Sequence, residues 1–289
     1  MRLEDQRESQ NVEDRRGQGY ASVGIGGRHI GIGSIVIALA ASYFLGVSPS
    51  TVLSLLSGFG GDTQSVNAPA QAPPANDAMA SFVSKILADT EDTWREYFKQ
   101  NGGTYQEPKL VLFTGETPTA CGTGQTAMGP FYCPGDQKVY IDLAFYQELQ
   151  DRFHAGGEFA EAYVIAHEVG HHVQNMLGLA DKIHQAQQSG DRAEANALSV
   201  RMELQADCYA GVWGHRADSM KHLLEPGEIE QALNAATAIG DDRLQKQAQG
   251  YAVPESFTHG TSAQRVHWFT QGFQIGDPRQ CDTFRASNL

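Results

Sequence analysis

The sequence predicts an α+β fold that is mostly helical with a small β-sheet and is preceded by one transmembrane helix. Three observations predict this class. Residues 30–47 form an uncharged apolar stretch, and residues 110–114 and 138–142 are short runs of the apolar and β-branched residues typical of strands. Most of the chain after residue 142 instead has apolar residues at helical spacing.

The N-terminal part predicts a membrane attachment. Residues 30–47 are near the lower length limit for spanning a bilayer, and the positive charges of Arg15, Arg16 and Arg28 precede them. We therefore expect residues 1–29 to be a cytoplasmic segment and residues 30–47 a transmembrane signal-anchor helix. A cleaved signal peptide, processed at Ala38-Leu-Ala40, and a buried core helix remain alternatives.

Composition separates a linker from a folded domain. Residues 48–78 are interpreted as a flexible linker, since positions 58–78 contain mainly Gly, Pro, Ala and polar residues. Folded sequence resumes at residue 79 and continues to 289. Residues 1–29 carry five arginines and five acidic residues, so the net charge of −13 belongs to the rest of the chain. Such a charge predicts no nucleic-acid binding.

The elements expected in the folded domain follow one another in a simple order. A long helix comes first, two strands follow, and the remainder is helical. The expected helices cover residues 77–101, 144–152, 159–178, 181–188, 191–217, 226–239 and 262–273, and the expected strands cover 110–114 and 138–142.

The segment His167-Glu-Val-Gly-His171 lies in the helix expected over 159–178. Residues four apart share one helix face, so both imidazoles can reach a single ion, with Glu168 beside them as a general base. Gly170 costs the helix about 1 kcal/mol relative to Ala, which indicates close packing against its backbone. Two buried core histidines are the alternative, but their burial without an ion is costly.

A third ligand is expected, because catalytic zinc usually takes three protein ligands. Another zinc-peptidase class needs glycine at position 174 and histidine at 177, but the chain has Gln174 and Leu177. Glu203 and Asp207 lie four apart on the next long helix, beside small residues. We assign Glu203 as the third ligand and Asp207 as the acceptor of a ligating histidine's N–H. An exchange of these two roles and a solvated acidic stripe remain open.

These residues resemble a known family. The motif at 167–171 followed by Glu203-Leu-Gln-Ala-Asp207 is similar to the gluzincin pattern of the membrane M48-type peptidases, and more closely to the bacterial neutral zinc metallopeptidases of the YpfJ-like family. Further segments carry the resemblance, which spans nearly the whole chain: residues 7–16, 121–142, 203–213 and 258–265. The resemblance implies a zincin-like fold, one Zn²⁺ per chain and a peptide or protein substrate.

The same resemblance directs attention to His259 and Arg265. In the M48-type pattern a histidine followed by an arginine on the next helix lies near the cleft, where either could stabilise an oxyanion. Here Thr258-His-Gly260 replaces the His-Pro of many relatives. The alternative is a surface position for His259, an acid partner for Arg265 and a helix-capping role for Ser262. The zincin-like order also places an edge strand beside the cleft, formed by residues 139–142 or by a neighbouring strand.

The cysteines indicate a compartment outside the cytoplasm. Four cysteines in an exported domain are interpreted as two disulfides, and four permit three pairings. Sequence alone does not choose among the three. We favour Cys121–Cys133, which would close a short loop, with Cys208–Cys281. A cysteine-rich metal site is the alternative, although no C-x-x-C motif occurs.

The expected function is that of a membrane-anchored zinc endopeptidase, in which Glu168 activates the attacking water. The chain would be a single-pass protein of the cell (inner) membrane, with the catalytic domain periplasmic or extracellular. Two other classes remain open: a non-catalytic, zinc-stabilised binding protein tethered to the membrane, and a zinc hydrolase of a non-peptide amide. The sequence identifies no protein partner.

Overall fold

The structure, a computed structural model, describes residues 1–17, 71–179 and 191–289. The predicted transmembrane helix over 30–47, residues 48–70 of the expected linker and the helix expected over 181–188 lie outside the described residues. Among the described residues, no helix is long and apolar enough to cross a membrane. One compact unit comprises Met1–Arg16 and Ala70–Leu289, so the N-terminal residues fold together with the motif helix. Residues 1–16 are therefore part of the folded unit, whereas their sequence predicts a separate cytoplasmic segment.

A four-stranded sheet forms one side of this unit. Its order is β1 (Val12–Asp14), β2 (Lys109–Phe113), β6 (Lys138–Asp142) and β5 (Phe131–Cys133). β1, β2 and β6 run parallel, and β5 runs antiparallel to β6. β6, which contains residues 139–142, therefore lies inside the sheet. The edge beside the cleft is formed by its neighbour β5, the other strand considered for this position.

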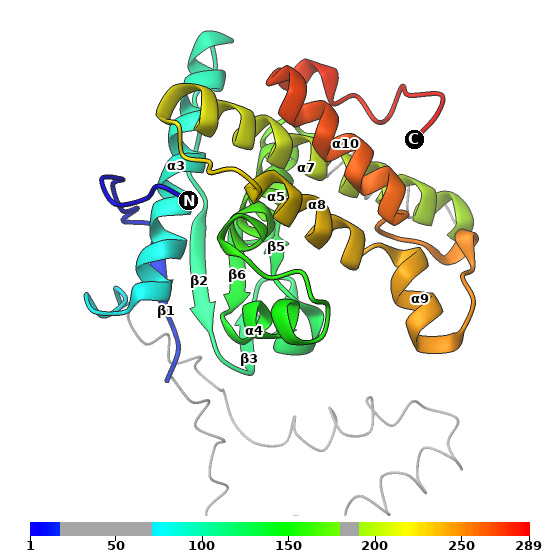
Figure 1. Cartoon of the computed structure of the whole chain (residues 1–289), viewed down its shortest axis with the longest axis horizontal. Helices are drawn as coiled ribbons and strands as arrows, with labels where there is room; N and C mark the ends of the chain where they lie inside the picture. Colours follow the sequence, from blue (N-terminus) through cyan, green and yellow to red (C-terminus); the bar gives the residue numbers. More distant parts are fainter. Residues whose placement is uncertain (18–70, 180–190) are drawn as a thin grey trace, which may run out of the picture. The chain divides into compact units, whose positions relative to one another are not determined.

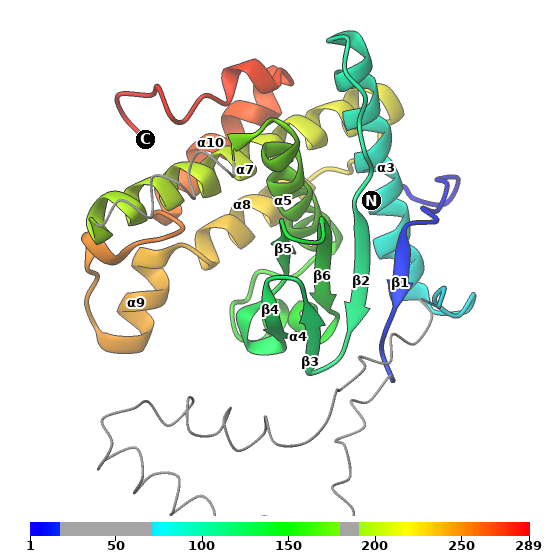
Figure 2. The ribbon, with the colours of Figure 1, turned by 180° about the vertical axis from the view of Figure 1, so that it is seen from behind.

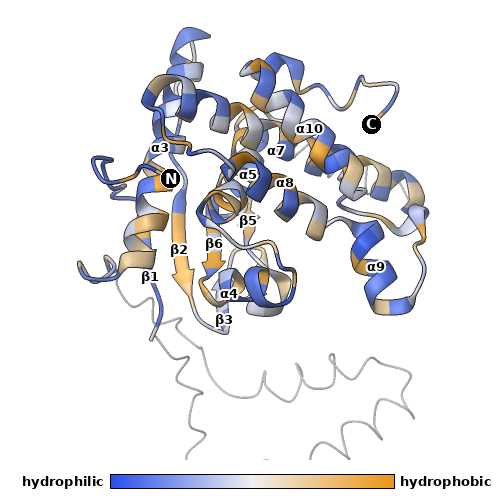
Figure 3. Cartoon of the chain, in the orientation of Figure 1, coloured by the Kyte–Doolittle hydropathy of each residue, from blue (hydrophilic) through white to orange (hydrophobic). Residues whose placement is uncertain are grey.

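The two faces of the sheet are buried against different layers. Leu110, Leu112, Val139 and Ile141 join the main hydrophobic core, as alternation along a strand requires. The opposite face presents a smaller cluster, centred on Tyr140, beside a hairpin of β3 (Glu116–Thr119) and β4 (Gly122–Gln125). Both faces are covered, which explains why β2 is an uninterrupted apolar run after Lys109, seen as the orange part of this strand in Figure 3.

Helices form the rest of the unit. They are α3 (Ala78–Gln100), α4 (Ala144–Asp151), α5 (Glu158–Met176), α7 (Arg192–Lys221), α8 (Glu228–Ala238), α9 (Asp241–Gln249) and α10 (Ser262–Ile275). In Figures 1 and 2, α5 lies between the sheet on one side and α7, α8 and α10 on the other. The motif helix is thus central, and most of its residues are buried.

Local signals explain where these helices begin. Asp77 and Asp191 cap α3 and α7 with their carboxylates. α10 begins with a capping box, in which the Thr261 side chain accepts from the backbone of Gln264 and the Gln264 side chain accepts from that of Thr261. The capping role considered as an alternative for Ser262 thus belongs to Thr261, because the Ser262 hydroxyl donates to the Thr237 carbonyl and to Asp242.

The structure joins Cys121 to Cys133 and Cys208 to Cys281, the pairing favoured from the sequence. The first bond connects the turn between β3 and β4 to the end of the edge strand β5. The second connects the middle of α7 to the C-terminal segment. Each disulfide therefore fastens a peripheral segment to an element next to the motif helix.

Candidate metal centre

Close packing of two helices brings the candidate ligands together. A Cβ at Gly170 of α5 would lie 3.1 Å from the Ala206 carbonyl oxygen of α7, so only a glycine lets the backbones approach this closely without displacement. Ala206 lies between Glu203 and Asp207 on α7. The close approach that Gly170 predicted therefore occurs, and it sets both acids against the histidine face of α5.

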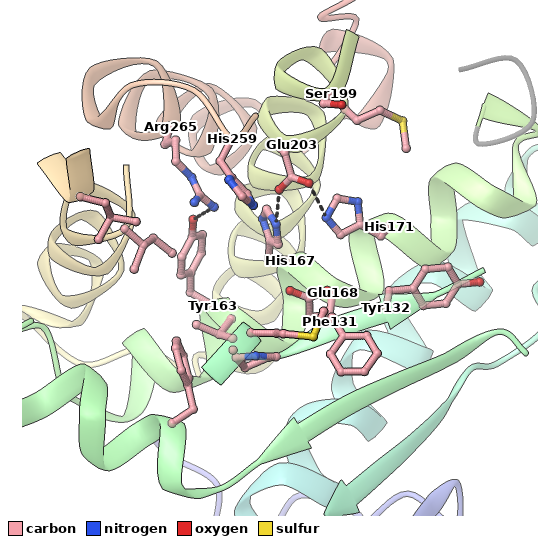
Figure 4. Close-up of a pocket in the computed structure, with 18 of the residues that line it drawn as sticks. Phe131, Tyr132, Tyr163, His167, Glu168, His171, Ser199, Glu203, His259 and Arg265 are labelled. Atoms are coloured by element: carbon pink, nitrogen blue, oxygen red, sulfur yellow. Dashed lines mark hydrogen bonds and ion pairs between the residues drawn. The ribbon is translucent and has the colours of Figure 1, made fainter. Parts of the chain in front are cut away.

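Three side chains converge as a metal site requires. His167 Nε2 lies 3.1 Å from Glu203 Oε2, and His171 Nε2 lies 3.5 Å from Glu203 Oε1. One atom from each of the three residues can be chosen so that all lie within 4.8 Å of one another. Ligand atoms of a tetrahedral zinc ion with bonds of about 2.05 Å are about 3.3 Å apart. The spacing of the three donors therefore fits zinc (Figure 4).

Each histidine is held by a second hydrogen bond that fixes which nitrogen faces the site. His167 Nδ1 is 2.8 Å from Asp207 Oδ1, as expected for Asp207. His171 Nδ1 is 2.9 Å from the Gln174 side-chain oxygen. Gln174 in turn donates to the Met202 carbonyl and to Gln205. Both Nε2 atoms are therefore left to ligate, in the arrangement that raises ligand basicity and orients the rings.

Arg265 is bound to Asp207 rather than directed at a reacting group. Its Nε and Nη2 donate to the two Asp207 oxygens at 2.8 and 2.9 Å, and Nη2 also donates to the Tyr163 hydroxyl at 3.1 Å. Tyr163 donates to the same carboxylate at 2.5 Å. Arg265 therefore has the acid partner considered as the alternative, and it holds Asp207 in place against His167 while also lining the cavity.

The charges around the site match a divalent cation. Glu168, Glu203 and Asp207 contribute three carboxylates and Arg265 one guanidinium, which leaves two negative charges when the histidines are neutral. Burial opposes ionisation of Asp207, but Arg265 and His167 lower its pKa to about 2. Burial likewise opposes protonation of His167, but Asp207 and Glu203 raise its pKa to about 10. Without a metal ion the protonated histidines compensate this negative charge, and a bound divalent cation would take the place of their protons.

Glu168 has the environment of a proton acceptor. It lies on α5 between the two histidines, and its side chain is nearly buried. Burial raises the pKa of Glu168, although His167 and His171 oppose this effect. A raised pKa brings a carboxylate closer to the pH at which it can both accept and return a proton.

The site opens into a cavity of about 1390 Å³. The edge strand β5 and the segment before it line this cavity, together with apolar residues of α4, α5, α7 and α9 and with Ile239 just after α8. His259 also lines this cavity, with half of its side chain exposed. Its Nδ1 contacts Asp241 Oδ1 at 3.3 Å, and Asp241 Oδ2 accepts the backbone N–H groups of Thr258, His259 and Gly260. The loop that carries His259 is therefore organised by Asp241, at the start of α9.

A hydrogen-bonded group connects the edge strand to the motif helix. Tyr132 Oη of β5 is 3.0 Å from His172 Nδ1 and accepts from Asn175 Nδ2 at 3.0 Å. His172 Nε2 is 2.6 Å from the Gln106 carbonyl oxygen, to which it donates. Burial lowers the pKa of His172, which favours the neutral ring. With its proton on Nε2, the ring can accept a hydrogen bond from the Tyr132 hydroxyl at Nδ1. β5 is thereby fixed relative to the candidate ligands.

Replacing Asp207 with asparagine is expected to raise the dissociation constant for zinc by about 10- to 100-fold, because an amide orients His167 poorly and no longer neutralises Arg265. Competition with a chromophoric chelator measures this constant. Asp89→Asn is the matched control, since Asp89 is also a buried carboxylate, but it accepts from Trp213 and Lys221 and contacts none of the candidate ligands. Equal zinc affinities in the two variants would contradict the role of Asp207.

Comparison with known proteins agrees with this geometry. The family model described as "Putative neutral zinc metallopeptidase" matches residues 1–284. The chain belongs to this family. It is 52% identical to the YpfJ protein of Escherichia coli strain K12 over 293 aligned residues, which cover 99% of this chain and 100% of that protein. It is 49% identical to Rv2575 of Mycobacterium tuberculosis strain H37Rv over 195 residues, 64% of this chain and 65% of that protein. No solved structure matches the chain.

Family membership confirms the resemblance inferred from the motifs and supports a metallopeptidase with zinc as its metal. Four residues around the site were not anticipated in their roles: Tyr132, Tyr163, Gln174 and Asp241. Gln174 and Tyr163 could have been found as polar residues on the buried histidine face of α5. The contacts of Tyr132 and Asp241 depend on tertiary packing between elements distant in sequence, which spacing does not encode.

Proposed function

We propose that this metallopeptidase is a zinc-dependent endopeptidase in which Glu168 is the general base. The observation that carries the proposal is the convergence of His167, His171 and Glu203 beside Glu168, in the wall of an open cavity bounded by a sheet edge. A structural zinc site usually has a fourth protein ligand and no adjacent base. The described residues supply three ligands and a base, which favours catalysis over a purely structural role.

In the proposed reaction the chain's own residues move the protons. A zinc ion held by the three ligands would act as a Lewis acid toward the scissile carbonyl and would acidify water. Glu168 takes the proton from the attacking water and passes it to the leaving amine. His259 is proposed to donate from Nε2 to the carbonyl oxygen as negative charge develops. Its hydrogen bond with Asp241 raises the pKa of His259, although partial burial opposes this effect, and the raised pKa favours the donating form.

The cavity shape supports a peptide as substrate. Among the described residues no strand pairs with the outer edge of β5, and Phe131 and Tyr132 of this strand line the cavity together with the ligands. An extended peptide can add to such an edge through backbone hydrogen bonds, which do not depend on its sequence. We therefore propose that the substrate lies along β5, with its scissile bond next to Glu168.

Digestion of a diverse peptide mixture tests the proposal. The full chain, zinc-loaded and with its disulfides intact, is compared with the same protein stripped of metal and then reloaded. We expect internal cleavage that is lost on stripping and restored by zinc, with the cut sites read by mass spectrometry. Absence of zinc-dependent cleavage from peptides, together with hydrolysis of small non-peptide amides, would redirect the assignment to another hydrolase. Stoichiometric zinc with no hydrolysis of either kind would favour the binding protein.

Tyr132→Phe is expected to raise KM roughly three- to ten-fold with little change in kcat, since it removes two hydrogen bonds that fix the edge strand but no group at the reacting atoms. Steady-state kinetics on one peptide identified in the digestion measures the split. Tyr140→Phe on the adjacent strand β6 is the control, because its hydroxyl bonds to Asp136 instead. A fall in kcat without a change in KM would place Tyr132 in the chemical step.

We also propose that the domain lies outside the cytoplasm and is attached to a membrane through residues 30–47. The two disulfides support an oxidising compartment. The uncharged apolar sequence of residues 30–47 supports the attachment. Fractionation of cells that express the tagged full chain tests both parts: we expect the protein in the membrane fraction, released only by detergent, with its disulfides formed.

A further inference from the structure

The N-terminal residues form an integral strand of the peptidase unit. β1 pairs with β2 in parallel, with Val12, Glu13 and Asp14 opposite Leu110, Val111 and Leu112. Backbone bonds continue beyond the strand: Leu110 donates to the Asn11 carbonyl at 2.9 Å, and Arg15 donates to the Leu112 carbonyl at 2.8 Å. The side chain of Val12 is buried in the main core. β1 therefore closes the sheet on the side opposite the substrate edge (Figure 1).

The polar residues before β1 are bound to a buried carboxylate of α3. Glu91 is 1% exposed, and it accepts from Arg7 at 2.8 Å, from Ser9 at 2.5 Å and from Asn11 at 2.9 Å. Ser9 and Ser84 exchange two further bonds, at 3.1 and 3.0 Å. If residues 1–16 were elsewhere, Glu91 would lose all three of these partners. A buried carboxylate without partners is strongly destabilising.

The charged residues in β1 and directly after it also bind to the rest of the domain. Glu13 forms ion pairs with Lys109 of β2 and Lys138 of β6. Burial would raise the pKa of Glu13, but its hydrogen bonds with these cations lower the pKa to about 2. The Arg15 guanidinium lies over the ring of Tyr140. Arg16 binds Asp14 and also Asp77, the cap of α3. The docked segment thus contacts two strands and a helix of the domain.

The chain also returns to the place from which it departs. The Asp14 N–H donates to the Gln71 carbonyl at 2.7 Å, in an antiparallel bridge between β1 and the segment before α3. The ends of the intervening stretch, residues 18–70, therefore begin and finish at the same edge of one folded unit.

We propose that residues 1–16, which include β1, are a permanent part of the peptidase domain. The N-terminus and residues 71–289 would then lie on the same side of any membrane that residues 18–70 enter. A chain that crosses a bilayer once would separate β1 from β2. The predicted arrangement, with a cytoplasmic N-terminus and a catalytic domain outside, is therefore replaced by an even number of crossings or by none. This inference does not rest on the proposed peptidase activity.

Withdrawal of β1 would leave the sheet in an unfavourable state. Leu110, Val111 and Leu112 are each fully buried in β2, and without β1 their strand would become an uncovered, hydrophobic edge. Exposed edges of this kind pair with other chains and aggregate. The strand is therefore expected to stay docked in the mature protein rather than to exchange between two positions.

Cysteine accessibility in cells tests the inference directly. The full chain has no free cysteine, so Asp5→Cys and Met220→Cys each introduce one reactive thiol at an exposed position, the first before β1 and the second at the end of α7. Spheroplasts are treated with a membrane-impermeant maleimide before and after permeabilisation. We expect the same pattern for both variants, either labelled or protected. Labelling of one before permeabilisation and of the other only afterwards would overturn the proposal.

Thermal unfolding of the full chain tests whether β1 contributes to the stability of the folded domain or only lies on the same side of the membrane. Val12→Asp is expected to lower the Tm by several degrees or to prevent folding, and Val12→Ala to lower it in the same direction by roughly 2–8 °C. Gln10→Asp, at an exposed neighbouring position, is the control and should leave the Tm within about 1 °C. Unchanged Tm values for both Val12 variants would show that β1 is not part of the cooperative unit and would overturn the proposal.

Discussion

Glu168→Gln is expected to lower kcat by roughly 10²- to 10⁴-fold while one zinc ion per chain remains bound. Glutamine keeps the volume of the side chain but cannot accept a proton from water. The three candidate ligands, His167, His171 and Glu203, are untouched by the change. Loss of turnover with retention of metal is the outcome that separates a general base from a ligand.

The measurement combines kinetics on an identified peptide with zinc analysis of the same protein preparation. Glu161→Gln is a closely matched control, because it makes the same substitution on the same helix, two turns before the base. Burial, with a smaller contribution from Glu158, raises the pKa of Glu161 to about 7, so a neutral side chain is tolerated there. We expect near-wild-type turnover from this control. If Glu168→Gln retained comparable turnover, the assignment of the base would be wrong.

The sequence predicted the candidate ligands because helical spacing is a local property. A separation of four residues fixes which side chains share a face, so His167 with His171 and Glu203 with Asp207 could each be paired before any fold was known. Gly170 added a tertiary prediction, since a glycine inside a buried helix indicates close contact, and the contact with Ala206 follows. The meeting of the two helices was thus encoded at one residue.

Spacing along the sequence did not predict the elements that are short or polar, nor the contacts between residues distant in sequence. β1 and β5 have three residues each, too few for a period of two to be recognised, and their place in the sheet depends on partners 98 and 7 residues away. α9 was missed because its sequence is almost wholly polar. Arg265 was judged by its resemblance to a cleft arginine, whereas its neighbour in space, Asp207, determines what it does.

The N-terminal segment shows how a local sequence pattern and the tertiary contacts of the same residues can favour different topologies. The positive charges before residues 30–47 do indicate a cytoplasmic N-terminus when a chain is considered one segment at a time. In the structure, however, the Arg15 guanidinium lies over the ring of Tyr140, and Arg16 forms ion pairs with Asp14 and Asp77. Both arginines therefore have a role in the folded domain, which supports our proposal that residues 1–16 and 71–289 lie on the same side of a membrane. The positive-inside tendency is therefore best applied after the contacts of such residues are known.

Glu203→Ala is expected to reduce bound zinc from about one ion per chain to nearly none after exchange into metal-free buffer. Glu203 is the one candidate ligand that reaches both histidines, at 3.1 Å from His167 and 3.5 Å from His171. Its removal leaves two nitrogen ligands, too few for a stable zinc site. Burial opposes the ionisation of Glu203, but His171 and His167 lower its pKa well below the usual value, so the carboxylate is available as a ligand.

Comparison of three variants by zinc analysis decides between the roles of the two acids on α7. Glu148→Ala removes a carboxylate that lines the same cavity outside the ligand set, and it should keep its zinc. Asp207→Asn should weaken zinc binding by less than Glu203→Ala, since it acts only through His167. The reverse order would mean that the two acids exchange roles. Full zinc occupancy in Glu203→Ala would remove it from the coordination sphere, and Glu168 would then have to be reconsidered as a ligand.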